Sequence, residues 1–338
     1  MIFLRAVPPG VVEGVASGIY KVTGSVVREG SSGRGVAFLQ ETGVLDQLLG
    51  SAVKGAGATL QSGFNPLGVL TAIQNQQIKS RLVEVQSSLA MLQNVQIGTL
   101  AVAGLGVGVS IAGFALMLKK LNTIDAHLKT LERKIDRITA DRRSDDLRLT
   151  LADVGTQLEV IDTLPARVNR VASAEAAERT LATLAGRLEA HFQHHSEAVQ
   201  SQHISLEDMD MLWSLAAAIR MCHEAGLRAL LTIDELQAAK ELASRRATRF
   251  LNLSQPLSPD ALSRLYAQRE DGVDAFARSR KAALPHAEIL VGGLRETVAS
   301  VASQAELADL LLQRQISGGD YFRAIEDEST EPLLALPV

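Results

Sequence analysis

The feature that most constrains this sequence is a run of 34 residues, Val85 to Leu118, without a single charged side chain. Its apolar centre, Ile97 to Leu118, has 22 residues. At about 1.5 Å per residue, a helix of that length spans roughly the 30 Å hydrocarbon core of a bilayer. The run therefore predicts a helix that sits in or enters a membrane. A helix enclosed in a soluble bundle is the alternative, because hydropathy alone does not separate the two.

Apolar residues on both sides of this run alternate in spacing between four and three residues, which predicts the a/d seam of a coiled coil. The first seam comprises Ile78, Leu82, Val85, Leu89 and Leu92, and the second comprises Leu121, Ile124, Leu128, Leu131, Ile135 and Ile138. The same spacing continued through the run gives Gln96, Thr99, Ala103, Gly106, Ser110, Gly113 and Met117. This series reaches Met117, four residues before Leu121, so the two seams meet there with a spacing of four in place of three. Up to Gly113 the positions that join them are small or polar.

This change of residue type along the seam has a physical reason in a membrane. In water, Leu and Ile at a seam drive helices together by leaving solvent. Lipid removes that force and favours close approach through small residues, with hydroxyl or amide hydrogen bonds. We therefore expect one continuous helix, from about Pro66 to Ala140, that self-associates in parallel. The alternative is a hairpin that turns at Gly104–Gly108, and the continuation of the seam spacing as far as Met117 favours the continuous helix.

Composition divides the remaining chain into further regions. Residues 1–65 are rich in Gly and Val, and two β-prone runs, 19–28 and 36–40, flank a glycine-rich turn and predict a β-hairpin. Asn65 and Pro66 are typical of a helix start, and they open the coiled-coil region 66–143. After a charged break at 141–146, a second coiled-coil stretch, 144–165, has a seam of its own. This seam comprises Leu147, Leu151, Val154, Leu158 and Ile161.

Residues 166–325 predict a helical bundle, and 326–338 predict an acidic, disordered tail. Ser205 and Thr232, each followed by acidic residues, and Ser258 before Pro259 are typical of helix starts. The pairs 292–293 and 318–319, all Gly, are expected to be breaks. The expected core comprises Trp213, Leu215, Ile219, Leu227, Leu230 and Leu231. The fold class is thus mainly α, with a long coiled-coil helix, a small N-terminal hairpin and a C-terminal bundle.

Histidines offer the nearest approach to a metal site in this sequence. His191, His194 and His195 share one expected helix, with His203 nearby, but no carboxylate has the spacing that completes such a site. A solvated polar helix face is the simpler interpretation. We therefore expect no metal.

Catalytic motifs are also absent. His223-Glu224 begins like a zinc-protease helix, but Leu227 stands where the second histidine is required. Cys222 precedes His223, and neighbouring side chains on a helix point apart, so we expect a buried structural cysteine. Gly104, Gly106 and Gly108 lack the preceding strand of a dinucleotide site. We expect no enzyme and no cofactor.

Charge and cysteine content limit the partners and the compartment. The net charge is −4 and no strongly basic block is present, so we expect no nucleic-acid partner. Cys222 is the sole cysteine, so no disulfide can form within the chain, and a reducing compartment is expected. The first ten residues lack the basic start and long apolar core of a signal peptide. Membrane insertion is therefore expected to depend on the internal segment.

Two stretches, Ser25 to Thr42 and Leu118 to Asp136, resemble a recurring type of uncharacterised bacterial protein. Its pattern is a short N-terminal hairpin, a Gly/Ala-rich apolar segment and a coiled coil of the form L-x-x-L-x-x-I-D-x-x-L. The resemblance covers roughly residues 18–140 and implies a bacterial origin without an established activity. The hairpin alternative also resembles the head-and-tail layout of α-helical pore-forming toxins of the cytolysin A type.

Together these patterns predict a self-associating helical protein that perturbs or permeabilises a bacterial membrane, as a toxin or defence effector. Its expected partners are the lipid bilayer, further copies of itself and an unknown protein bound by the C-terminal bundle. Its expected location is the bacterial inner membrane, or the cytoplasm before insertion. Two alternatives remain open: a non-toxic membrane-anchored scaffold or signalling coiled coil, and a soluble helical structural assembly protein.

Overall fold

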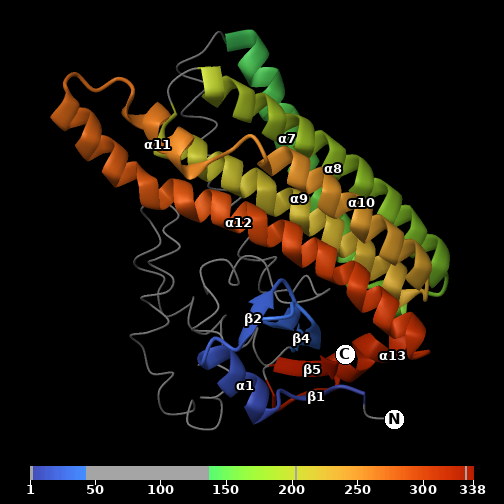
Figure 1. Ribbon diagram of the computed structural model, residues 1–338. Helices are drawn as coiled ribbons and strands as arrows, with labels where there is room; N and C mark the ends of the chain where they lie inside the picture. Colours follow the sequence, from blue (N-terminus) through green and yellow to red (C-terminus); the bar gives the residue numbers. More distant parts are fainter. Residues whose placement is uncertain (1–2, 43–136, 202–203, 332) are drawn as a thin grey trace. The chain divides into compact units, whose positions relative to one another are not determined.

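The computed structural model describes residues 3–42, 137–201, 204–331 and 333–338 (Figure 1). This part of the chain is mainly helical and carries a small antiparallel sheet, as the sequence predicts. It divides into two compact units. We call the first the sheet unit, whose described residues fall within 3–42, 227–244 and 299–338. The second, the helical unit, has described residues within 137–226 and 245–298.

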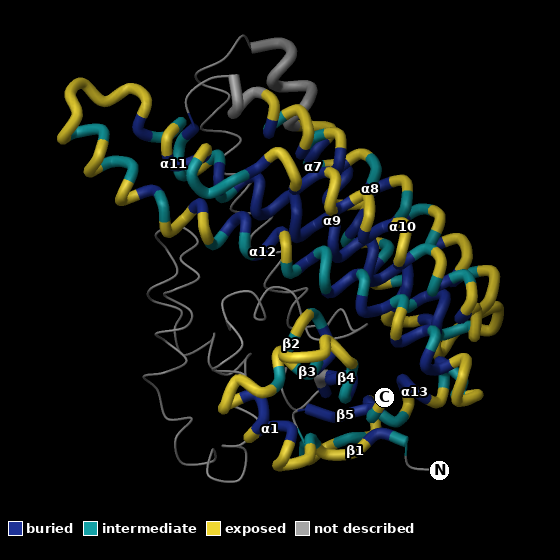
Figure 2. The backbone as a smooth tube through the Cα atoms, viewed as in Figure 1, coloured by how far each residue is buried: buried dark blue, intermediate teal, exposed yellow. Residues whose placement is uncertain are grey.

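Helices form most of the described chain (Figure 1). They are α1 (Pro9–Ala16), α7 (Arg137–Asp162), α8 (Arg170–Ser201), α9 (Leu206–Thr232), α10 (Leu236–Ser254), α11 (Pro259–Ala267), α12 (Val273–Gln313) and α13 (Gly318–Glu326), with a 3₁₀ turn, η2 (Leu164–Ala166), after α7. Helices α9, α10 and α12 contribute residues to both units. In the helical unit, α7 and α8 lie side by side, and their inner faces are buried while their outer faces are exposed (Figure 2).

The seam expected in 144–165 is buried in α7. Its five apolar residues are at most 6% exposed, and the helix packs on α8 of the same chain. The break expected at 141–146 is wrong, because α7 runs from Arg137 to Asp162 without interruption. Charged residues do not end a helix by themselves, since their helix propensities are close to those of other ordinary residues.

Two helix starts are confirmed by their caps. The hydroxyl of Ser205 accepts a hydrogen bond from the backbone N–H of Asp208, and the Asp208 carboxylate accepts one from the N–H of Ser205, which together form a capping box. Ser258 accepts from the N–H of Ala261, with Pro259 at the first helical position. Thr232 is different: it is the last residue of α9, and α10 begins only at Leu236.

The break expected at Gly292–Gly293 is wrong, because both residues lie inside α12. Gly293 faces the indole ring of Trp213, and a Cβ added there would lie 1.9 Å from Cζ3. Its hydrogen side chain therefore permits close packing of α12 on α9, at a helix-propensity cost of about 1 kcal/mol relative to Ala. The second pair, Gly318 and Gly319, also lies inside a helix, at the start of α13, and the interruption falls just before it, after α12 ends at Gln313.

The sheet unit is built on antiparallel strands in the order β1-β5-β4-β3-β2. Their bounds are β1 (Arg5–Ala6), β2 (Tyr20–Thr23), β3 (Val26–Glu29), β4 (Gly35–Glu41) and β5 (Leu333–Pro337). The strands β2, β3 and β4 form a meander, whereas β5 comes from the far end of the sequence and lies between β1 and β4. In its register, Ala335 pairs with Arg5 on one side and with Leu39 on the other.

Two sequence expectations are corrected by this sheet. The hairpin is present as β3 and β4, but the run 19–28 is itself two strands that turn at Gly24 and Ser25. The tail 326–338 is not wholly disordered, because α13 continues to Glu326 and Leu333–Pro337 form a buried strand (Figure 2). The acidic residues that suggested disorder precede four consecutive apolar residues, which alternate between two buried faces.

Side chains of each strand point alternately to the two faces of the sheet, as strand geometry requires. In β5, Leu334 and Leu336 join a core with the C-terminal end of α9, the N-terminal end of α10, the C-terminal end of α12 and α13. Leu333 and Ala335 face the other way, onto the valines of α1. The expected core residues are all buried but divide between the units: Trp213, Leu215 and Ile219 belong to the helical unit, and Leu227, Leu230 and Leu231 to the sheet unit.

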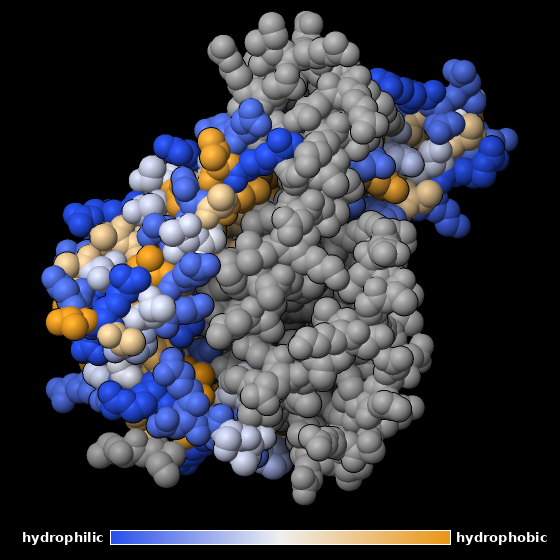
Figure 3. Space-filling model, turned by 180° about the vertical axis from the view of Figure 1, so that it is seen from behind, coloured by the Kyte–Doolittle hydropathy of each residue, from blue (hydrophilic) through white to orange (hydrophobic). Residues whose placement is uncertain are grey.

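Among the described helices, none combines the length and the apolar character needed to cross a membrane. On the face that Figure 3 shows, hydrophobic residues of the described part are scattered among hydrophilic ones. Large exposed apolar side chains occur at separate places, such as Leu149 in α7, Val168 before α8 and Val273 at the start of α12. The apolar segment 97–118 lies outside the described residues.

Candidate functional site

The seam residues predicted for the membrane segment and for the two flanking coiled-coil stretches lie outside the described residues. The exception is Ile138, which lies in the first turn of α7. The helix start at Asn65–Pro66 and the hairpin turn at Gly104–Gly108 also lie outside. Within the described chain, two other groups of residues stand out by their contacts.

Two of the histidines of α8 pair separately with acids on two other helices. Nε2 of His191 lies 2.9 Å from Oδ2 of Asp146 in α7, and Nε2 of His195 lies 3.3 Å from Oδ1 of Asp208 in α9. Within the ranges that the structure describes, no three His, Cys, Asp or Glu side chains are grouped so that they could hold a metal ion. These histidines therefore join neighbouring helices through single carboxylates; His203 lies outside the described residues.

Asp208 both caps the start of α9 and pairs with His195 of α8. Its burial raises the pKa of the carboxyl, but the interactions with His195 and with the backbone and hydroxyl of Ser205 outweigh burial and hold the pKa below its ordinary value. The carboxylate therefore caps α9 and contacts α8 at the same time.

The first group, which we call the buried cluster, lies inside the helical unit. It comprises Glu178 and Glu189 from α8, His223 from α9, and Arg246 and Arg249 from α10. His223 is 2% exposed and Arg246 is 4% exposed. Charged side chains are rarely so buried unless they are paired, because removing a charge from water costs several kcal/mol, roughly.

Contacts in the buried cluster link all three helices. Arg246 donates from Nη1 to the carbonyl oxygen of His223 at 3.0 Å, and from Nη2 to Oε1 of Glu178. Nη2 of Arg249 lies 2.8 Å from Oε2 of Glu189, and the other oxygen of that carboxylate lies 3.4 Å from Nε2 of His223. The two carboxylates and two guanidiniums balance in charge, so the cluster is neutral when His223 is neutral.

The imidazole of His223 favours its neutral form. Burial lowers its pKa, the Glu189 carboxylate opposes this, and the Arg246 and Arg249 guanidiniums add to the lowering. Its Nδ1 atom has no hydrogen-bond partner among the described residues. A proton taken up by His223 would add a charge to a buried environment that is already balanced.

Cys222, next to His223, has no nucleophilic character. The residue is fully buried, and burial raises the pKa of its thiol to about 12. A thiol that stays protonated and meets no solvent is chemically inert. This confirms the expected buried cysteine.

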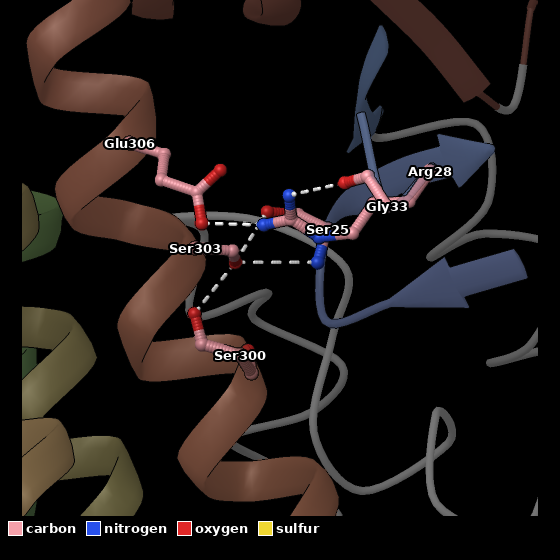
Figure 4. Close-up of polar contacts among 6 residues, drawn as sticks. All are labelled: Ser25, Arg28, Gly33, Ser300, Ser303 and Glu306. Atoms are coloured by element: carbon pink, nitrogen blue, oxygen red, sulfur yellow. Dashed lines mark hydrogen bonds and ion pairs between the residues drawn. The ribbon is translucent and has the colours of Figure 1, made fainter. Parts of the chain in front are cut away.

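The second group, which we call the hairpin contact, joins the turn between β2 and β3 to α12 (Figure 4). The backbone N–H of Ser25 donates to Oγ of Ser303 at 3.3 Å, and the two hydroxyl oxygens lie 2.8 Å apart. Ser303 also donates its own proton to the carbonyl oxygen of Ser300 at 2.7 Å. The Ser25 hydroxyl is therefore the donor between the two serines, and both residues are at most 2% exposed.

Two further features fix the hairpin contact. Gly24 has φ +60, and a Cβ added there would lie 2.7 Å from Cα of Ser300. Arg28 donates from Nη2 to Oε1 of Glu306 at 2.5 Å and from Nη1 to the carbonyl of Gly33 at 3.3 Å. The backbone of the turn thus lies directly against the helix, with an ion pair at its exposed edge.

Sequence reasoning did not find either group. The i,i+4 pair Arg220 and Glu224, whose side chains meet at 2.6 Å in α9, is a local signal for polar contacts near His223. No local signal joins Ser25 to Ser303, which are 278 residues apart. Comparison with family models, with curated proteins and with solved structures finds no match to this chain.

Proposed function

We propose that this chain is a self-associating, membrane-acting helical protein that perturbs or permeabilises a bacterial membrane. The observation that carries the proposal is the uncharged run from Val85 to Leu118 with its seam of small residues. Such a seam suits helices that approach each other closely in lipid. The protein would act at the inner membrane, after folding in the cytoplasm.

The described structure supports this proposal through the place of the run in the chain. The strand β4 ends at Glu41 before the run, and α7 begins at Arg137 after it. Both flanks are therefore folded, and residues that precede and follow the run share one sheet. A folded part of this kind can anchor and restrain an apolar segment, because the sheet and the hairpin contact join residues that precede the run to residues that follow it.

The proposal is tested by enlarging the seam. Gly106→Leu with Ser110→Leu fills two seam positions, and Val107→Leu with Val109→Leu is the matched control off the seam. The measurements are cross-linked oligomers and dye leakage from vesicles of phosphatidylglycerol and phosphatidylethanolamine. We expect the seam variant to lose both and the control to keep both. Unchanged oligomers and leakage in the seam variant would count against the proposal.

One observation favours a second candidate, a soluble helical structural protein. The α7 seam is buried and packs on α8 of the same chain. A seam whose apolar residues are buried within one chain does not require a second copy of the chain to cover them. Ultracentrifugation after lysis, with and without detergent, separates the candidates: the membrane-acting protein sediments unless detergent is added, and the soluble protein stays in the supernatant. A non-toxic membrane anchor would sediment without causing leakage.

A further inference from the structure

The sheet unit contains residues from both sides of the apolar run. Residues 3–42 precede the run and supply β1 to β4 and α1, whereas 299–338 follow it and supply β5, α13 and the end of α12. Five register pairs, from Ala37–Pro337 to Glu41–Leu333, join β4 to β5. The hairpin contact adds a second join between the same two parts of the chain.

A helix that crosses a bilayer once leaves its two flanks on opposite sides. At about 1.5 Å per residue, the 22 residues from Ile97 to Leu118 suffice for one crossing of a roughly 30 Å core and not for two. After such a crossing, β4 and β5 could not remain paired, because one strand precedes the run and the other follows it.

We propose that the sheet unit is a catch that must open before the apolar run can cross a membrane. The catch consists of the β4–β5 pairing and the hairpin contact at Ser25 and Ser303. This inference rests on the proposed membrane function and adds a step to it. While the sheet is intact, the run is confined to one side of the bilayer.

The hairpin contact is suited to open as a unit. Its polar part is one chain of hydrogen bonds, in which Ser303 accepts from the N–H and the hydroxyl of Ser25 and donates to Ser300. If the two serines separated but stayed buried, their polar groups would lose hydrogen-bond partners at a high cost in free energy. If they are exposed to water as they separate, water replaces those partners and the net cost is small. The exposed ion pair of Arg28 and Glu306 adds little, since both side chains are solvated.

A disulfide across the hairpin contact tests the catch. The variant Ser25→Cys/Ser303→Cys of the full chain is compared, oxidised and then reduced with dithiothreitol, in dye leakage from the same vesicles. We expect little leakage when oxidised and full leakage after reduction. Ser25→Cys alone is the control. Its dye leakage should be the same before and after reduction, because Cys222 is buried and cannot form a disulfide with Cys at position 25. Mobility in a non-reducing gel verifies the cross-link.

The outcomes separate the two proposals. If the wild type leaks and the verified, oxidised variant leaks equally, the catch is overturned and the membrane function stands. If the wild type causes no leakage, the membrane function itself is overturned. Should the serine pair not cross-link, Arg28→Cys/Glu306→Cys places a disulfide at the outer edge of the same contact. Leakage that returns only on reduction of either pair supports the catch.

Discussion

Gly293 in α12 lies against Trp213 in α9, so that an added Cβ would fall 1.9 Å from Cζ3 and 2.0 Å from Cη2 of the indole ring. Its neighbour Gly292 has nothing within 4 Å of the same position. Two adjacent glycines in one helix therefore have opposite roles. One permits close packing, and the other only lowers the helix propensity of α12.

This difference predicts opposite effects of the same substitution. Gly292→Ala should raise the free energy of unfolding by up to about 1 kcal/mol, because Ala has the higher helix propensity. Gly293→Ala should lower it by about 1–3 kcal/mol, because the ring of Trp213 must move in a packed core. Urea unfolding followed by circular dichroism measures both. Equal effects at the two positions would contradict the packing of Gly293 on Trp213.

The buried cluster predicts a dependence of stability on pH. His223 has a lowered pKa in the folded chain, so below about pH 6.5 the unfolded state binds a proton that the folded state does not. Stability from this residue is complete above about pH 6.5 and falls as the pH approaches the folded pKa, by at most about 1.4 kcal/mol per pH unit. Lower pH should therefore reduce the free energy of unfolding of the helical unit.

His223→Gln removes this titration while keeping a polar side chain. Between pH 7.5 and 5.5, we expect the variant to lose less stability than the wild type, as measured by urea unfolding at each pH. His191→Gln is the matched control, because His191 pairs with Asp146 outside the buried cluster. If His223→Gln does not fold, hydrogen exchange of α9 in the wild type is measured instead. After correction for the intrinsic effect of pH on exchange, its amides should be less protected at pH 5.5 than at pH 7.5. An acid response that is identical in wild type and His223→Gln would exclude His223 as its source.

The hairpin contact predicts a difference between two glycines with similar backbone angles. Gly24 has φ +60 and Gly33 has φ +70, so Ala is strained at both. Only Gly24 also lies against α12, where its Cβ would be 2.8 Å from the carbonyl oxygen of Ala299. Gly33→Ala should cost about 1 kcal/mol of stability, and Gly24→Ala clearly more. Hydrogen exchange of β2 and β3 should rise in Gly24→Ala alone; similar exchange in both variants would argue against the contact.

Local signals in the sequence predicted the local parts of this structure. The stripe from Leu147 to Ile161 has helical spacing and is buried as one face of α7. Ser205 and Ser258 are predictable as caps, because capping depends on residues three apart. These features need only neighbouring residues, so a single sequence contains the information for them.

The remaining features depend on contacts between distant residues, which a single sequence does not show. Gly292–Gly293 carry the signal of a break, and only the position of Trp213 explains why the helix continues. Glu178 and Arg246 are 68 residues apart, and nothing local shows that they meet. The apolar residues 333–336 were too few to be recognised as a strand without the neighbours β1 and β4.

The strand β5 lies between β1 and β4, so removing it should destabilise the sheet, whereas removing a disordered tail would not. Leu333 and Leu336 are fully buried and Leu334 is 3% exposed. Burying a leucine stabilises a fold by about 1.5–3 kcal/mol, so three of them contribute an amount comparable to the whole stability of a small domain. A chain that ends at Glu331 should therefore lose the sheet, and hydrogen exchange of β3 and β4 should become fast. Leu336→Ala should cost about 2–5 kcal/mol by leaving a cavity in the same core. Removal of Val338 alone is the control, since this residue is 55% exposed. Protected β3 and β4 amides in the truncated chain would show that β5 is not needed to hold the sheet together.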